Sequence, residues 1–179
     1  MPDGAIVRHC PDYGPATKLL GCLDDPDASD ILYCDDDWHY DHIWAETLCA
    51  ARGKRNGVFA ATSFPISRLK RHAASGRDQV AQGFGGVLVR KDMFGPDVFD
   101  LPDAAYAADD IWLSGYLAAR NIPIWQASKA RELCTPAITA GDQLQDSCIS
   151  GLNRKAANSA CADAVSRRFG IWPRNVSAL

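Results

Sequence analysis

The sequence lacks the long apolar stretch that a membrane-spanning helix needs. No run of about 18 apolar residues occurs in the chain of 179 residues. The beginning of the chain also lacks the charged and apolar pattern of a secretory signal peptide. We therefore expect no transmembrane segment and a cytoplasmic location.

Cysteine is present, but its spacing excludes a zinc site and gives no disulfide framework. The seven cysteines are odd in number and none form a Cys-x-x-Cys pair. Several lie in apolar patterns, where a free thiol acts as a small hydrophobic group. His39 and His42 lie three residues apart, but no second Cys or His pair accompanies them. These features favour a reducing compartment.

The sequence also lacks an excess of positive charge, since 19 Lys and Arg residues stand against 22 Asp and Glu residues. The formal net charge is −3, and the basic residues do not form a stripe. A local cluster, Arg68 to Arg77, is typical of a solvated face. We therefore expect no nucleic-acid partner. A phosphate-binding P-loop is also excluded, because no Gly-Lys-Ser or Gly-Lys-Thr follows the glycine-rich segment at residues 83–86.

What the chain does contain is an alternation of short apolar runs and amphipathic segments. The runs predict strands at residues 5–7, 31–34, 57–61, 87–89 and 122–125. The amphipathic segments predict helices at residues 15–23, 40–52, 106–120 and 145–169, and the polar segment 64–77 predicts a long loop. This alternation predicts one α/β domain over residues 1–179, with a mostly parallel sheet and flanking helices.

Three consecutive carboxylates, Asp35, Asp36 and Asp37, directly follow one expected strand. Ligands bind at the carboxyl ends of strands in α/β folds, and a divalent cation offsets repulsion between carboxylates. The run is therefore a candidate metal and phosphate site. A solvated acidic turn that caps the next helix fits the same residues.

A second acidic pair, Asp109 and Asp110, opens the helix expected next. Acids in the first turn stabilise a helix, so capping alone explains the pair. A carboxylate held near a substrate hydroxyl at this point also suits a general base. Between the two acidic groups lie Gly83, Gly85 and Gly86, which permit either a close approach to a ligand or a bulge without one.

Four short segments follow one another in order along the chain. They are residues 14–18 (Gly-Pro-Ala-Thr-Lys), 35–37 (Asp-Asp-Asp), 83–86 (Gly-Phe-Gly-Gly) and 109–114 (Asp-Asp-Ile-Trp-Leu-Ser). In type and order they resemble nucleotide-sugar glycosyltransferases of the A-type fold, particularly family 2-like bacterial enzymes. The resemblance covers most of residues 10–125. It implies that fold, a nucleotide-sugar donor, a saccharide or other hydroxyl acceptor, and inverting transfer assisted by Mn²⁺ or Mg²⁺.

The resemblance also implies roles for individual residues. Asp37 and Asp35 would bind the metal ion, and Asp110 would be the catalytic base, with Asp109 as the second choice. The remaining implied contacts are donor binding by Lys18, Asp35, Asp36, Gly85 and Gly86, and acceptor binding by Trp112.

One feature departs from this family. Its members begin with a strand and helix that hold the nucleoside base, some tens of residues before the Gly-Pro segment, whereas Met1 stands only thirteen residues before Gly14. We therefore expect a fold that is incomplete at its N-terminus. The alternative function is a truncated, non-catalytic binding or interaction module that self-associates through an exposed sheet edge. A metal-dependent phosphohydrolase fits less well, because the acidic run lacks the threonine of haloacid-dehalogenase-type motifs.

Overall fold

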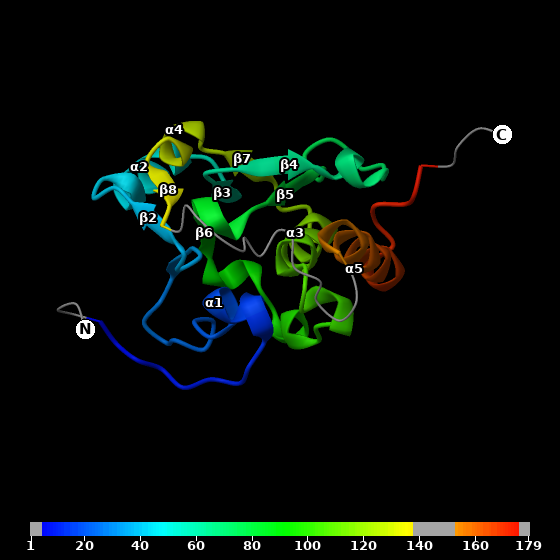
Figure 1. The fold of residues 1–179 in the computed structure, drawn as a ribbon, viewed down its shortest axis with the longest axis horizontal. Coiled ribbons are helices and arrows are strands. Elements are labelled where there is room, and N and C mark those ends of the chain that lie inside the picture. Colours follow the sequence, from blue (N-terminus) through cyan, green and yellow to red (C-terminus); the bar gives the residue numbers. More distant parts are fainter. Residues whose placement is uncertain (1–4, 138–152, 176–179) are drawn as a thin grey trace.

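A computed structural model describes residues 5–137 and 153–175, and a four-stranded sheet forms its centre (Figure 1). In spatial order the strands of this sheet are β1 (Asp30–Tyr33), β6 (Val87–Arg90), β3 (Val58–Ala60) and β7 (Ile124–Gln126). Two smaller sheets pair β2 (Trp38–Tyr40) with β8 (Cys134–Pro136), and β4 (Ser63–Pro65) with β5 (Gln79–Ala81).

The helices form two groups around the central sheet. Helix α3 packs against α5, and α2 packs against α4, as Figure 1 shows. The α-helices are α1 (Thr17–Leu20), α2 (Trp44–Arg52), α3 (Asp109–Ala119), α4 (Ser128–Arg131) and α5 (Arg154–Phe169). Short 3-10 helices are η1 (Gly14–Ala16), η2 (Ile66–Leu69), η3 (Gly83–Gly85), η4 (Lys91–Met93), η5 (Pro96–Phe99) and η6 (Asp103–Ala105). None of the helices in the described ranges combines the length and apolar character needed to cross a membrane.

The prediction of a mostly parallel sheet with the glycosyltransferase A-type fold is wrong. Strand β6 runs antiparallel to both β1 and β3, and β3 with β7 is the one parallel pair among the described strands. Both small sheets are antiparallel. The cause lies in the connection from β3 to β6. It holds the β4–β5 hairpin, whereas a parallel return is usually made through a crossover helix.

Other expectations about local structure also need correction. Residues 5–7 form no strand, and Ile6 and Val7 are 78% and 62% exposed, so they lack the partner that a strand requires. The loop expected at residues 64–77 is interrupted by the end of β4 and by η2. Helix α2 begins only at Trp44 because β2 takes the preceding aromatic residues. The last helix is confirmed from Arg154 onward, and residues 145–152 of that prediction lie outside the described ranges.

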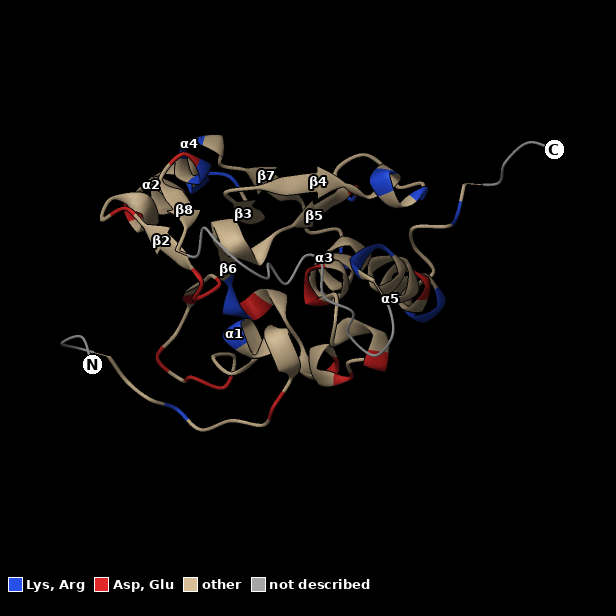
Figure 2. Cartoon of the chain, viewed as in Figure 1, with Lys and Arg blue, Asp and Glu red and all other residues tan. Residues whose placement is uncertain are grey.

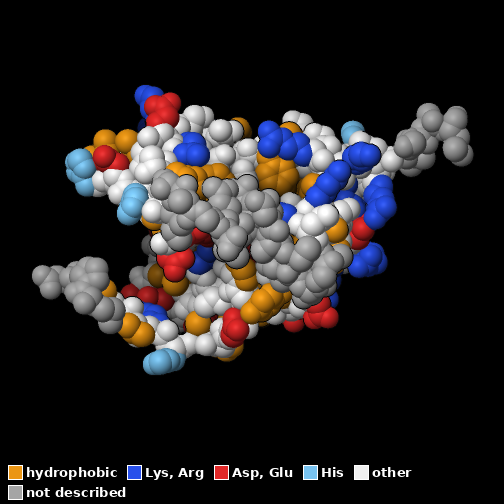
Figure 3. Space-filling model, viewed as in Figure 1, with side chains coloured by type: hydrophobic (Ala, Val, Ile, Leu, Met, Phe, Trp, Pro, Cys, Tyr) orange, Lys and Arg blue, Asp and Glu red, His pale blue; other side chains and the backbone are white. Residues whose placement is uncertain are grey.

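The basic cluster at residues 68–77 is not uniformly a solvated face. Arg71 is only 2% exposed, and its guanidinium donates to Ser166 Oγ and Asp163 Oδ1 on α5 at 2.8 and 2.5 Å. It also donates to the carbonyl oxygen of Trp172 at 3.0 Å. Arg71 therefore links the segment after η2 to α5 through hydrogen bonds. Figure 3 shows further Lys and Arg side chains gathered on this side of the molecule.

The core places α1 and α3 beside the end of β1. Leu19 and Leu20 of α1 are buried in the same apolar cluster as Ile31 and Tyr33 of β1 and Ile111 of α3. Ile31 and Tyr33 share this cluster because every second side chain of a strand points to the same face of the sheet. The packing brings the polar ends of all three elements together.

The central sheet has two edges among the described strands. Strand β1 pairs only with β6, and β7 pairs only with β3. An unpaired edge strand presents backbone groups to other chains. Self-association through a sheet edge therefore stays a prediction.

Candidate functional site

The candidate site lies at the carboxyl end of β1, where a lysine bridges two acidic groups. Lys18 Nζ of α1 donates to Asp35 Oδ1 at 2.6 Å and lies 3.1 Å from Asp109 Oδ2. The Lys18 side chain is only 17% exposed. Burial alone would lower the pKa of its amino group, but the carboxylates of Asp109, Asp110 and Asp35 raise it well above its ordinary value. Lys18 therefore stays charged.

The two acids that open α3 have different surroundings. Asp109 is 8% exposed, and its Oδ2 makes the ion contact to Lys18 without the alignment of a hydrogen bond. Asp110 Oδ1 accepts a hydrogen bond of 3.0 Å from the backbone N–H of Gly83. Burial, and then the charge of Asp109, raise the pKa of Asp110 to about 7, although Lys18 and the Gly83 N–H act in the opposite direction. Asp110 is thus the carboxyl group suited to exchange a proton near neutral pH.

Gly83 is the glycine of the 83–86 segment that belongs to this cluster. A Cβ atom there would lie 2.5 Å from Lys18 Nζ and 3.1 Å from Asp35 Oδ1. A larger residue there would displace the Lys18 ammonium from its present position beside Asp35. The sequence alone does not distinguish Gly83 from Gly85 and Gly86, since three glycines within four positions look equivalent.

Gly85 and Gly86 pack against a tryptophan. The indole N–H of Trp44 donates to the carbonyl oxygen of Gly85 at 2.9 Å. Gly86 has φ +96°, and a Cβ atom there would collide with the Trp44 ring. Packing accounts for both glycines without a ligand, and their expected contacts with a donor stay a prediction.

Asp36 and Asp37 form the exposed part of the acidic run. Both are exposed, and their carboxylates have neither ion pairs nor hydrogen-bond donors within residues 5–137 and 153–175. The backbone carbonyl of Asp37 accepts from the N–H of Ala137 at 2.9 Å, just beyond β8. The loop is therefore held by its backbone, while its two carboxylates face water. Figure 2 marks this loop before β2, and the start of α3, in red.

The acidic loop fits a divalent cation only in part. No group of three or more His, Cys, Asp or Glu side chains that could hold a metal ion occurs in the described part of the chain. One oxygen of Asp35 is taken by Lys18, which leaves its second oxygen and the carboxylate of Asp37. Mg²⁺ is commonly bound by one or two carboxylates, with phosphate and water completing the shell. Within the described residues, the loop therefore offers two carboxylates and no complete set of side-chain ligands for a cation.

Aromatic residues that sequence reasoning missed hold this end of the sheet. The Tyr40 hydroxyl lies 2.8 Å from the carbonyl oxygen of Asp35 and 2.9 Å from that of Phe84, so it links the acidic loop to η3. Trp38 stacks on Phe84 with ring centroids 4.6 Å apart. The guanidinium of Arg131 lies 5.0 Å from the Trp38 ring centroid. The signal in the sequence was an aromatic residue at every second position of β2.

Trp112, expected to contact an acceptor, lies in the core. It is 1% exposed, and its indole N–H donates to the carbonyl oxygen of Val98 at 3.2 Å. Its ring packs on Phe169 of α5 with centroids 5.4 Å apart. It therefore has no surface to offer a ligand. An apolar residue one turn into a helix is more often turned inward than toward a substrate.

Neither protein-family models, nor curated proteins, nor solved structures gave a match to this chain. The structure brings Lys18, Asp35, Asp109 and Asp110 into one cluster.

Proposed function

We propose that the chain transfers a sugar from a nucleotide-sugar donor to an acceptor hydroxyl, with inversion and with Asp110 as the general base. One observation carries the proposal: Asp110, whose pKa is raised to about 7 by burial and by Asp109, accepts a hydrogen bond from the Gly83 N–H in the same cluster as Lys18 and Asp35. A base for a hydroxyl group works best when its pKa is close to the working pH.

The division between Asp109 and Asp110 supports this assignment. Asp109 is engaged by Lys18, whereas Asp110 has a raised pKa and one backbone hydrogen bond from Gly83. Neighbouring acids whose surroundings differ in this way often divide structural and proton-transfer roles. In the proposed reaction Asp110 takes the proton of the acceptor hydroxyl. The hydroxyl oxygen then bonds to the anomeric carbon. The bond between that carbon and the diphosphate oxygen breaks, and its electron pair stays with the departing nucleoside diphosphate.

The acidic loop supplies the second part of the proposal. Asp35 and Asp37 would bind Mn²⁺ or Mg²⁺ together with the donor diphosphate, and the metal ion would neutralise the leaving group. Lys18 adds a fixed positive charge beside the same phosphates. Asp36 is exposed next to both ligands and makes the loop more attractive to cations.

The choice of glycosyl transfer rests on the resemblance of the four segments, because a base beside a metal–phosphate site also suits other transfers. The corrected sheet gives no support from fold, since it is not of the A-type. What supports the proposal is that residues from all four segments, Lys18, Asp35, Gly83 and the Asp109–Asp110 pair, contact one another.

A non-catalytic module that associates through a sheet edge is the second candidate. Two observations favour it: β1 has a single neighbouring strand in the described ranges, and the acidic loop does not by itself complete a metal site. Such a module would keep the cluster of charged residues without turnover.

Calorimetric titration with UDP and GDP, each with and without Mn²⁺, tests the binding step. We expect nucleotide binding that needs Mn²⁺ and that Asp37→Ala weakens by about tenfold or more, because a hard ligand is lost. Asp24→Ala removes an equally exposed carboxylate away from the site and is the matched control. Mn²⁺-dependent binding that Asp37→Ala leaves unchanged would exclude the proposed metal ligand. If neither nucleotide binds in the presence of Mn²⁺, the non-catalytic module is favoured.

A further inference from the structure

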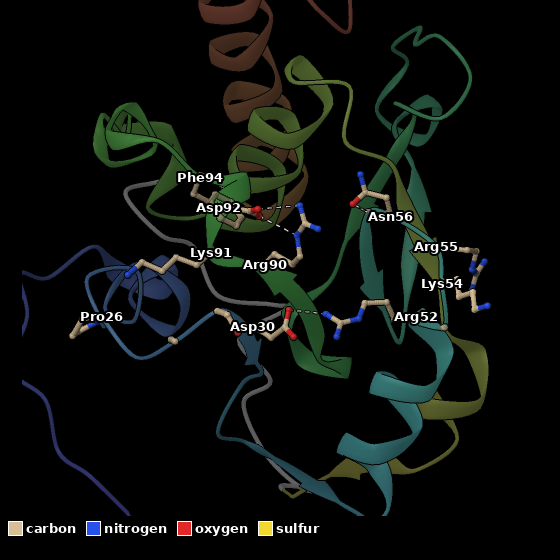
Figure 4. A pocket seen from close by; sticks show the side chains of 14 residues that line it. Pro26, Asp30, Arg52, Lys54, Arg55, Asn56, Arg90, Lys91, Asp92 and Phe94 are labelled. Carbon is tan, nitrogen blue, oxygen red and sulfur yellow. Dashed lines mark hydrogen bonds and ion pairs between the residues drawn. The ribbon is translucent and has the colours of Figure 1, made fainter.

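A hollow lies at the end of the central sheet opposite to the acidic site (Figure 4). Its volume is about 760 Å³, which is within the range of small-molecule sites. The walls come from three loops: the one before β1, the one between α2 and β3, and the one after β6. None of these residues belongs to the acidic site.

The charged residues that line this hollow are mostly basic. There are five basic residues, Arg52, Lys54, Arg55, Arg90 and Lys91, and two acidic ones, Asp30 and Asp92. Excess positive charge around a concave surface raises the local concentration of anions. The hollow is therefore suited to an anionic ligand.

Two arginines are held in place across the hollow. Arg52 reaches from the end of α2 to Asp30 at the start of β1, and donates through Nη1 at 2.6 Å (Figure 4). Arg90, at the end of β6, binds both carboxylate oxygens of Asp92 through Nε and Nη2 at 3.0 Å. Each guanidinium thus makes an ion pair at the wall of the hollow.

Both arginines keep donors for a ligand. A guanidinium has five N–H groups, so the Arg52–Asp30 bond leaves Nε and Nη2 of Arg52. The Arg90–Asp92 pair leaves Nη1 of Arg90. The partners Asp30 and Asp92 have side chains 40% and 69% exposed, so both ion pairs are near water and weakly held. An oxyanion can therefore add to or compete with them.

The other lining residues add charge and one apolar surface. Lys91 Nζ donates to the carbonyl oxygen of Asp25 at 2.6 Å, which fixes its ammonium at one side. Lys54 and Arg55 point outward in Figure 4, so they would attract an anion only through their electrostatic field. Phe94 lines the same hollow beside Asp92. A ligand with a phosphate and an organic part would match these groups.

We propose that this hollow, the basic end of the sheet, binds a small molecule that carries a phosphate or diphosphate, held between Arg52 and Arg90. Guanidinium groups bind phosphate through paired, charge-assisted hydrogen bonds. The site is independent of the acidic end. Asp30 pairs with Arg90 at this end, and Tyr33 with Val87 at the other, so about 10 Å of strand separate them.

Calorimetric titration with inorganic pyrophosphate, at low salt and with EDTA present, tests this site without any metal-dependent binding. We expect the wild-type protein to bind, and Arg90→Gln and Arg52→Gln each to weaken binding by about tenfold. The matched control is Arg168→Gln, since Arg168 and its partner Asp100 are as exposed as Arg90 and Asp92 but lie elsewhere. Circular dichroism checks that each variant is folded.

The outcomes separate clearly. Binding that falls in the two variants, is kept in Arg168→Gln and weakens with added salt supports the site. No binding by wild type up to about 10 mM pyrophosphate, or equal loss in Arg168→Gln, overturns it. Uridine monophosphate and inorganic phosphate, titrated in the same way, distinguish the sources. A nucleotide affinity about tenfold higher identifies an organic phosphate, and equal affinities identify the free anion.

Discussion

The two ends of the β1–β6 strand pair carry charged side chains that differ in sign and in burial. At the acidic end, Lys18 and Asp109 have side chains only 17% and 11% exposed. At the basic end, Arg90 and Asp92 have side chains 46% and 69% exposed. Buried charges perturb one another's pKa values strongly, whereas exposed pairs are screened by water. The burial at the acidic end fits the proton transfer that we propose there, and the exposure at the basic end fits the proposed attraction of an anion.

The same difference predicts how each end contributes to folding. Removing one member of a buried ion pair leaves an uncompensated charge, while removing one member of an exposed pair costs little. The charges at the acidic end are thus coupled to the fold. The charged residues at the basic end can be substituted without unfolding the protein, so mutations can test the comparison of the two ends.

The largest effect is expected on transfer by the acidic end. In Asp110→Asn the amide cannot accept the acceptor's proton, so sugar transfer should fall by roughly a hundredfold or more, while Mn²⁺-dependent nucleotide binding persists. Transfer is measured with radiolabelled nucleotide sugars, and Asp103→Asn, an exposed residue of η6, is the control. Equal transfer by wild type and Asp110→Asn would move the base elsewhere, with Asp109 next to test.

A smaller effect, on stability, sharpens the contrast between the ends. Lys18→Met should lower the free energy of unfolding by about 3 kcal/mol at pH 8, because Asp35, Asp109 and Asp110 lose their shared cation. Arg90→Met should change it by no more than about 0.5 kcal/mol. Urea denaturation measures both values. The comparison fails if the two substitutions cost the same.

The smallest effect is the pH dependence of stability that Asp110 confers. Its pKa is raised to about 7 in the folded protein from an ordinary value of 3.8, so the folded state binds the proton more tightly. The stabilisation is complete below pH 4 and is lost as pH rises to about 7. Asp110→Asn should therefore be more stable than wild type at pH 8, by on the order of 1 kcal/mol, and not at pH 4.

Thermal unfolding of wild type and Asp110→Asn at the two pH values measures this difference. Asp97→Asn provides the opposite control. A hydrogen bond from Tyr116, and then one from Arg120, lower the pKa of Asp97, so its loss should not stabilise the protein at pH 8. A gain for Asp110→Asn at pH 4 as large as at pH 8 would contradict the raised pKa.

Elements with a clear local signal were predictable from the sequence. The apolar run before Asp35 is β1, and the helix with two acids in its first turn is α3. Period and capping are local properties, so one segment is enough to reveal them. The resemblance implied that Lys18, Asp35 and the Asp109–Asp110 pair serve one reaction, and these side chains do lie together, but their roles stay predictions.

What the sequence could not reveal depends on contacts between distant segments. The direction of β6 is set by the β4–β5 hairpin, which leaves no trace in the pattern of Val87 to Val89. Which glycine faces Lys18 is set by the packing of Trp44 against its neighbours. The basic end combines three loops that are far apart in the chain, and none is notable alone.

The central claim is that Asp110 is held near neutral pKa by burial and by Asp109. Carbon-13 NMR titration of the aspartate carboxyl groups tests it most directly, with the Asp110 signal identified by its absence in Asp110→Asn. The account predicts a pKa of about 7 for Asp110, and a lower value in Asp109→Asn, because burial and the Asp109 charge are the causes of the shift. An Asp110 pKa near the ordinary 3.8, unchanged in Asp109→Asn, would contradict it.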